Sequence, residues 1–203
     1  MRTLQQPLFT PETEWVPPDR LPDLSSYKEI AIDLETRDPS LTTMGSGAVR
    51  REGEVVGIAI AVEGWSGYFP IAHEGGGNMD RYLVLDWFEE VLHTTSTKIF
   101  HNAMYDVSWI RSLGFQINGG IVDTMVAASL CNENRYSYTL DSVAKEYVGM
   151  SKNEKLLQEA AKDWGINPKA EMWRLPAPFV GEYAEKDAEI TLKLWGAMQH
   201  EIS

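Results

Sequence analysis

The alternation of apolar and polar residues predicts a β-rich first half of the chain. In "KEIAIDL", residues 28–34, isoleucine and leucine alternate with alanine and aspartate, as in a strand with one buried face. Two further β-rich runs, 53–64 and 66–72, are separated by Gly64, and "TKIFHN" at 97–102 has the composition of a short strand. We expect these segments to form a sheet.

A helical period dominates the second half. The interruptions at Pro168, Pro176 and Pro178 divide a C-terminal region that is otherwise mostly helical. Early strands and late helices together predict an α/β fold in which a mixed β-sheet is flanked by α-helices. Two helices are expected at 78–94 and 103–113. Within 119–132 we expect a turn followed by a helix that begins near Asp123. A further helix is expected between the Thr139 cap and Gly149.

The chain has the size of one domain with an arm. Its 203 residues, 43% of them hydrophobic, suffice for one well-packed core. Residues 1–27 carry five of the ten prolines and little periodicity, which is typical of an extended arm. We therefore expect a proline-rich N-terminal arm at 1–27 and the functional domain at 28–203.

Charge and cysteine content exclude several classes of protein. The formal net charge of −12, from 30 acidic and 18 basic side chains, argues against nucleic-acid binding by phosphate neutralisation alone. Cys131 is the single cysteine, and the four histidines have no zinc-binding spacing. With no signal segment and no apolar run of about 18 residues, an intracellular protein without a membrane span is expected.

Carboxylates mark the candidate chemistry. Asp33 and Glu35 lie two residues apart on the first strand and so project from the same face. Such a pair alone is weak support, because exposed acids are usually only solvated.

Two predicted helices each place one aspartate on an apolar stripe. Asp187 is the only charge on the stripe of helix 182–198, and Asp106 interrupts the apolar side of helix 103–113. Capped or ion-paired structural aspartates remain one interpretation. However, no lysine or arginine lies on these stripes, so a divalent cation is the better partner. An all-oxygen ligand set favours Mg²⁺ or Mn²⁺.

Three motifs, in order, resemble a known family. They are "DLE" on a strand, "HNAMYD" at a strand-to-helix junction and "YAEKDAEIT" on a late helix. This set resembles the exonuclease motifs of the DEDDy 3′–5′ exonucleases, above all the proofreading domain of family A DNA polymerases. The likeness runs from Tyr27 to Met198, and "VDTMVAASL" and "YTLDSVAKEYVG" extend it to the ribonuclease D branch. It implies a ribonuclease H-like fold.

The resemblance also implies roles for individual residues. The catalytic acids would hold two divalent cations, Mg²⁺ or Mn²⁺, and a tyrosine would orient a metal-held water. Thr36 and Asn102 would contact the terminal nucleotide, and Leu41 is the candidate for a wedge beside it. The implied catalytic residues are Asp33, Glu35, Asp106, Tyr183 and Asp187.

Several basic residues lie on segments that could flank a bound single strand, or could simply be solvated. They are Arg37, Arg50, Arg51, Lys152, Lys155, Lys162, Lys169 and Arg174.

The sequence thus predicts a metal-dependent 3′–5′ exonuclease acting on single-stranded or frayed DNA 3′ ends and releasing 5′-mononucleotides. Proofreading for a DNA polymerase, present in cis or in trans, is the expected purpose. Two alternatives remain: a ribonuclease D-type enzyme that trims RNA 3′ ends, and an inactive nucleic-acid-binding domain of the same fold. The presence of all four acids argues against the last.

Overall fold

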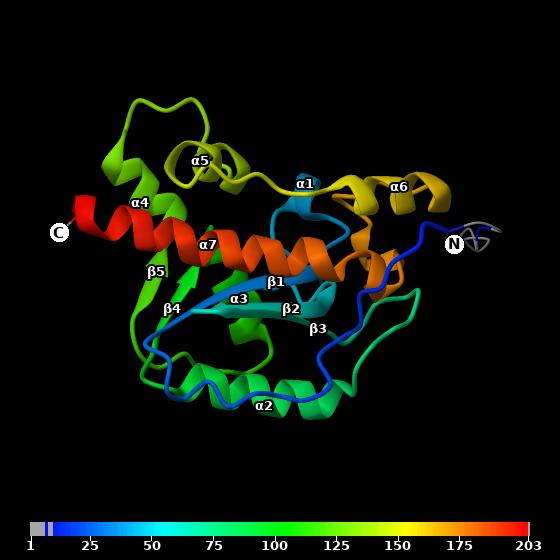
Figure 1. Ribbon diagram of the computed structural model, residues 1–203. Helices are drawn as coiled ribbons and strands as arrows, with labels where there is room; N and C mark the ends of the chain where they lie inside the picture. Colours follow the sequence, from blue (N-terminus) through cyan, green and yellow to red (C-terminus); the bar gives the residue numbers. More distant parts are fainter. Residues whose placement is uncertain (1–6, 8–9, 203) are drawn as a thin grey trace.

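A five-stranded mixed sheet forms the centre of the computed structural model (Figure 1). The structure describes residue 7 and residues 10–202; the remaining positions of the expected arm, 1–6 and 8–9, and Ser203 lie outside the described residues. The strand order is β3-β2-β1-β4-β5. The strands are β1 (Glu29–Arg37), β2 (Glu54–Val62), β3 (Trp65–Pro70), β4 (Thr97–Phe100) and β5 (Ile121–Asp123).

The sheet combines an antiparallel meander with two parallel strands. β1 pairs antiparallel with β2, and β2 with β3, whereas β1 to β4 and β4 to β5 are parallel. β1 is therefore the central strand. The register of β1 and β2 shifts between Glu35 and Thr36, which marks a β-bulge at the end of the predicted acidic motif.

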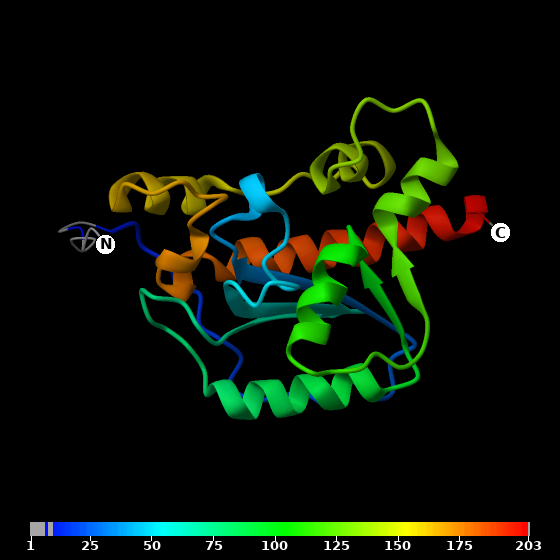
Figure 2. The ribbon, with the colours of Figure 1, turned by 180° about the vertical axis from the view of Figure 1, so that it is seen from behind.

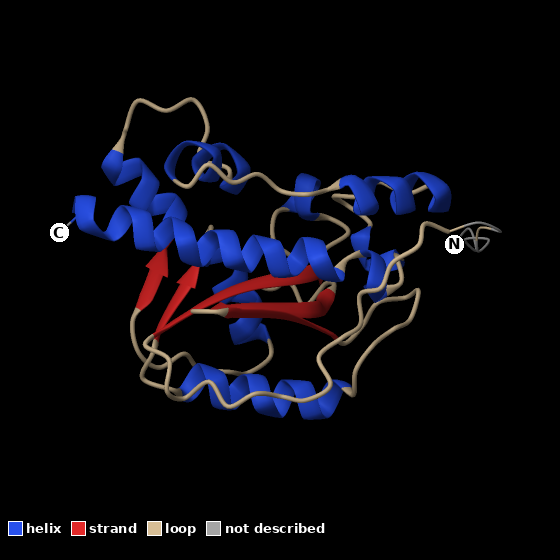
Figure 3. Cartoon of the chain, viewed as in Figure 1, coloured by secondary structure: helices blue, strands red, loops and turns tan. Residues whose placement is uncertain are grey.

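Helices cover both faces of the sheet (Figures 2 and 3). Two 3₁₀ turns, η1 (Met172–Arg174) and η2 (Ala177–Phe179), precede the last helix. In the described part of the chain the α-helices are α1 (Leu41–Met44), α2 (Arg81–His93), α3 (Ala103–Ser112), α4 (Thr124–Cys131), α5 (Leu140–Tyr147), α6 (Lys155–Trp164) and α7 (Gly181–Ile202).

The two faces of β1 enter different cores. Ile30, Ile32 and Leu34 pack with α2 and α3 in the larger apolar cluster. Ala31 lies on the opposite face, in a cluster with Ala184 and Ala188 of α7. Such small side chains on both elements let α7 approach the sheet closely. The long last helix thus crosses the face from which Asp33 and Glu35 project (Figure 1).

The expected mixed sheet flanked by helices is confirmed, with one correction along the chain. The turn expected before the helix that begins near Asp123 is instead β5, a three-residue strand at the sheet edge. Three residues are too few to show an alternating pattern. Parallel pairing with β4, at Lys98 to Phe100, makes this segment a strand.

Residues 10–27 form neither helix nor strand and lie against the domain. Trp15 is buried, and its indole Nε1 donates to Glu185 of α7 at 2.9 Å. Leu24 is buried in the larger apolar cluster. Among the described residues, no helix is both long enough and apolar enough to cross a bilayer.

Candidate active site

Strand β1 supplies the first two carboxylates. Asp33 pairs with Ala59 and Glu35 with Gly57 across the antiparallel ladder, so both acids share the face covered by α7. Both acids are half-buried. Leu34, which lies between them, and Ile32, which precedes them, are buried on the other face. The predicted common orientation of the two acids is therefore present.

Helix α3 brings Asp106 to the same strand. Its Oδ1 accepts a hydrogen bond from the backbone N–H of Leu34 at 2.9 Å. β4 pairs with β1 only as far as Ala31, so β4 offers no backbone carbonyl to the N–H of Leu34. The Asp106 carboxylate accepts that hydrogen bond in its place. Asp106 is thus fixed beside the peptide that joins Asp33 to Leu34.

Helix α7 adds Asp187 and Tyr183 on its inner side. Asp187 is 4% exposed and lies between Ala184 and Ala188, the residues that pack on the sheet. Tyr183 precedes Asp187 by about one helical turn, which places the two side chains next to each other. The apolar stripe predicted for this helix is the buried one.

Lys152 contacts the acid and the tyrosine of α7, which the sequence did not predict. Its Nζ lies 2.7 Å from Asp187 Oδ2 and 3.2 Å from the Tyr183 hydroxyl. It comes from the connection between α5 and α6, not from an inner helix face, so no periodicity could reveal it. The expectation that the inward acids have no basic partner is therefore wrong for Asp187.

The charges of the four acids act on one another. Burial, together with the charge of Asp187, raises the pKa of Asp33 to about 7, although Lys152 opposes the shift. The pKa of Glu35 is raised well above its usual value by burial and then by Asp33 and Asp187. Burial and the Asp33 charge likewise raise the pKa of Asp106. One ammonium does not neutralise this cluster.

The donor set suits a hard divalent cation. Asp187 Oδ1 is buried with no hydrogen-bond partner in the described structure, although an unpaired buried carboxylate oxygen is costly. The neighbouring candidate ligands are all carboxylate oxygens, which Mg²⁺ and Mn²⁺ prefer. Among the described residues, no three Asp, Glu, His or Cys side chains are already arranged as a metal cage. The Lys152 ammonium supplies the positive charge at Asp187 instead.

The two predicted nucleotide contacts lie at the ends of β1 and β4. The Thr36 hydroxyl is 2.7 Å from the Tyr105 hydroxyl, which in turn donates to Asp38 at 3.1 Å. Asn102 is exposed and has a left-handed backbone with φ of 67°. Asp123 fixes this conformation by accepting from the backbone N–H groups of Asn102 and Ala103.

Asp123 also caps the helix that was expected to begin near it. It is the N-cap of α4, and its side chain accepts from the backbone N–H of Met125 at 2.9 Å. One carboxylate therefore joins the start of α4 to the start of α3, the helix that carries Asp106.

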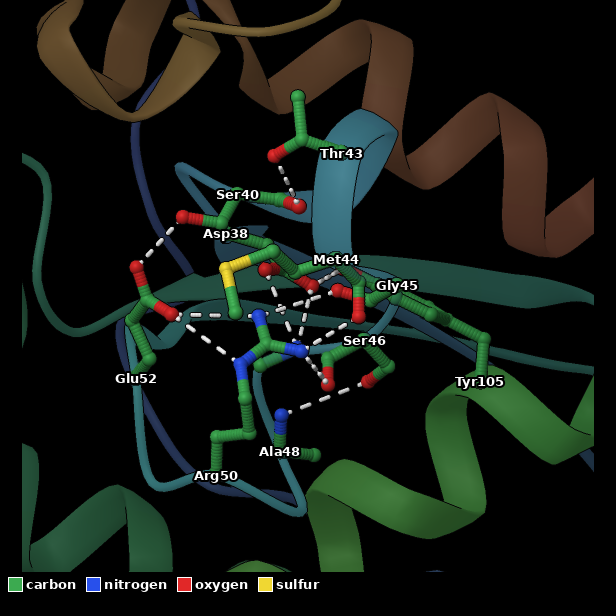
Figure 4. A network of polar contacts seen from close by, with 11 residues as sticks. Asp38, Ser40, Thr43, Met44, Gly45, Ser46, Ala48, Arg50, Glu52 and Tyr105 are labelled. Carbon is green, nitrogen blue, oxygen red and sulfur yellow. Dashed lines mark hydrogen bonds and ion pairs between the residues drawn. The ribbon is translucent and has the colours of Figure 1, made fainter.

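Leu41 begins α1 in the long connection between β1 and β2, and it is 43% exposed. Arg50 braces this connection: its guanidinium donates to the carbonyls of Met44 and Gly45 and to the carboxylate of Glu52 (Figure 4). Glu52 also accepts from Ser40 at 2.6 Å. The exposed leucine thus lies in a connection that is held in shape by side-chain hydrogen bonds.

A buried polar pair beside Glu35 was not predicted. The Tyr68 hydroxyl lies 2.6 Å from His73 Nε2, and His73 Nδ1 donates to the Leu175 carbonyl at 3.0 Å. Burial lowers the pKa of His73 to about 4, so the ring is neutral and its Nε2 accepts a hydrogen bond from the Tyr68 hydroxyl. A Cβ at Gly57 would lie 2.0 Å from the Tyr68 oxygen. An isolated glycine within a strand pattern is the signal that could have indicated this close approach.

Comparisons with known proteins agree with this geometry. The family model of the 3′–5′ exonuclease of family A DNA polymerases matches residues 13–203. A DNA-directed DNA polymerase of Pseudomonas phage M6 is 40% identical over all of this chain, which spans 32% of that polymerase.

Two solved structures share the fold. Trypanosoma brucei RNase D has a TM-score of 0.63 at 20% identity, over 86% of this chain and 58% of that one. Brucella melitensis NrnC with bound Mg²⁺ has a TM-score of 0.58 at 20% identity, over 88% and 75% of the two chains.

The chain therefore belongs to the 3′–5′ exonuclease family found in family A DNA polymerases, and its sheet and helices have the ribonuclease H-like fold.

Proposed function

We propose that this domain removes nucleotides from the 3′ end of single-stranded or frayed DNA, releases 5′-mononucleotides and uses two divalent cations. The observation that supports this most strongly is that four carboxylates, from β1, α3 and α7, lie close enough for their charges to act on one another. A cluster this negative attracts cations and, without them, repels a phosphodiester.

The site residues divide into cation ligands and groups that handle water and substrate. Asp33, Glu35 and Asp187 would hold a first Mg²⁺ or Mn²⁺ ion, and Asp33 and Asp106 would hold a second. When bound, such ions would supply an activated water and stabilise charge on the leaving oxygen. Burial, followed by the charge of Asp187, raises the pKa of Tyr183, so the phenol keeps its proton and can orient the water.

Three residues are proposed to hold the terminal nucleotide. Thr36 follows the β1 acids directly, and Asn102 precedes the helix of Asp106. Leu41 is the exposed apolar group on the braced loop, suited to packing against a base.

Proofreading in cis is the purpose we propose. The phage relative is a DNA polymerase, and this chain corresponds to about a third of its length. A 3′–5′ exonuclease joined to a polymerase acts on the strand end that the polymerase has just extended. We therefore infer a polymerase domain as the functional partner.

RNA 3′-end trimming is the second candidate, favoured by the likeness in fold to an RNase D. A digestion of 5′-labelled single-stranded DNA and RNA of the same sequence distinguishes the two. We expect a Mn²⁺- or Mg²⁺-dependent ladder that shortens DNA from its 3′ end, and none with Asp187→Asn.

Asp86→Asn provides the matched control, because Asp86 is an exposed residue of α2 outside the cluster. Preferential shortening of RNA would replace the DNA assignment with the ribonuclease one. Intact strands of both kinds with every cation would favour a binding domain without activity.

A further inference from the structure

Lys152 lies between the two functional side chains of α7. Its side chain is 16% exposed, and its ammonium is 5.1 Å from the centre of the Tyr183 ring in addition to its contacts with the Asp187 carboxylate and the Tyr183 hydroxyl. The backbone N–H of Lys152 donates to Asp141 of α5, which anchors the segment between α5 and α6. This lysine is therefore held in place from both its backbone and its side chain.

The contact with Tyr183 fixes the direction of a proton. An ammonium has three donors and no acceptor, so the Tyr183 oxygen must accept the hydrogen bond from Lys152. A phenol is protonated near neutral pH, and its own O–H then points away from the lysine. The tyrosine hydroxyl is left as a donor on the side facing Asp187, and its hydrogen bond opposes the rise that burial causes in the pKa of that carboxyl.

The contact with Lys152 gives the two oxygens of the Asp187 carboxylate different surroundings. Lys152 takes Oδ2 at 2.7 Å, whereas Oδ1 is buried without a partner in the described structure. A cation that enters this site finds one oxygen occupied by an ammonium and the other free.

We propose that Lys152 is a positioning residue of the exonuclease reaction, which aims the Tyr183 hydroxyl and restricts Asp187 to a single oxygen for the cation. This inference rests on the proposed function. It also predicts that the lysine has opposite effects on turnover and on cation affinity: its charge repels the cation, while its hydrogen bonds orient the tyrosine.

Lys152→Met, which keeps the length of the side chain and removes the donor, tests this in the full chain. Turnover of single-stranded DNA at saturating Mn²⁺ should fall about 10- to 100-fold, as for other residues that orient metal-site groups. Mn²⁺ affinity, measured by electron paramagnetic resonance without substrate, should rise about tenfold, because a nearby like charge has been removed.

A double-mutant cycle with Tyr183→Phe distinguishes a loss of Tyr183 orientation from a general structural effect of the Lys152 substitution. Loss of the tyrosine hydroxyl should reduce turnover much less in the Lys152→Met background than in the wild type, because the hydroxyl is already misdirected there. Lys152→Arg, which keeps charge and donors, should restore part of the turnover. Lys145→Met removes an exposed lysine of α5 and should change neither quantity.

Weaker Mn²⁺ binding together with slower turnover in Lys152→Met would indicate a merely structural role and overturn the inference, as would unchanged values of both. The Mn²⁺ measurement needs no turnover. If the wild type hydrolyses no nucleic acid, the proposed function fails, while a rise in Mn²⁺ affinity still supports the lysine's effect on Asp187.

Discussion

Asp33 is the residue through which the acid cluster is connected. Its charge raises the pKa of Glu35 and of Asp106, and its own pKa is raised by burial and by Asp187. Asp33 therefore acts electrostatically both on an acid of its own strand and on the acid of α3. A shared ligand between two cations would have this position.

Asp33→Ala should lower hydrolysis of single-stranded DNA by several orders of magnitude, because the bridging ligand is lost. The free energy of unfolding in EDTA should not decrease, since the substitution removes a repelling charge. Turnover by a labelled-strand assay and unfolding in urea measure the two effects. Near-normal turnover in this variant would refute the assigned role of Asp33.

His73 provides a pH-dependent contribution to stability. Its folded-state pKa of about 4 lies below the usual value of 6.5, because the ring is buried between Tyr68 and the Leu175 carbonyl. The unfolded chain therefore binds a proton below about pH 6.5 that the folded chain binds only near pH 4. The contribution is complete above pH 6.5 and is lost as the pH falls towards 4.

A comparison of wild type with His73→Gln isolates this effect from the carboxylates, which are common to both. The stability advantage of the wild type, from urea unfolding, should shrink by about 2 kcal/mol between pH 7 and pH 5. A difference that stays constant over this range would show that His73 does not titrate as described.

At the scale of elements, the β1–β2 ladder is shaped by a missing side chain. Gly57 pairs with Glu35, and the Tyr68 ring occupies the space that a Cβ at position 57 would need. The Tyr68 hydroxyl in turn reaches His73, which is bonded to the segment leading into α7. A glycine on β2 thus makes room for the tyrosine that is joined, through His73, to the segment before α7.

Gly57→Ala should destabilise the fold by about 1–3 kcal/mol, because the tyrosine must move in a packed core. Gly196→Ala is the matched control: Gly196 is exposed on α7 with nothing within 4 Å of an added Cβ. That change should stabilise by about 0.5–1 kcal/mol. Equal unfolding midpoints for the two variants would contradict the packing described for Tyr68.

The elements also show what sequence can predict here. Helix periodicity correctly predicts that Asp106 and Asp187 point inward, and strand periodicity predicts the common face of Asp33 and Glu35. Lys152 escaped prediction because it reaches the site from an irregular connection, which has no period. β5 was missed for a related reason: its three residues are a strand only because β4 is there to pair with them.

For the whole molecule, the apolar core and the cation site are separable. Ile30, Phe69, Phe88 and Phe100 lie in the large cluster on the face of the sheet opposite the carboxylates. Burial of this kind, not ion binding, supplies the main stabilisation of a domain of this size. The site carries a charge repulsion that the fold tolerates.

EDTA should therefore abolish hydrolysis without unfolding the protein. The far-ultraviolet circular dichroism should be unchanged, and adding Mn²⁺ back should restore activity and raise the melting temperature, because a bound ligand stabilises the folded state. Cooperative unfolding on chelation alone would show that the ions hold the fold together.

Anomalous diffraction from crystals soaked in Mn²⁺ tests the central claim most directly, because it locates the ions without assuming an activity. We predict manganese peaks within coordination distance of the Asp33, Glu35 and Asp187 carboxylates, and their loss in Asp33→Ala. A fully occupied manganese position elsewhere, with these carboxylates free of metal, would contradict the account.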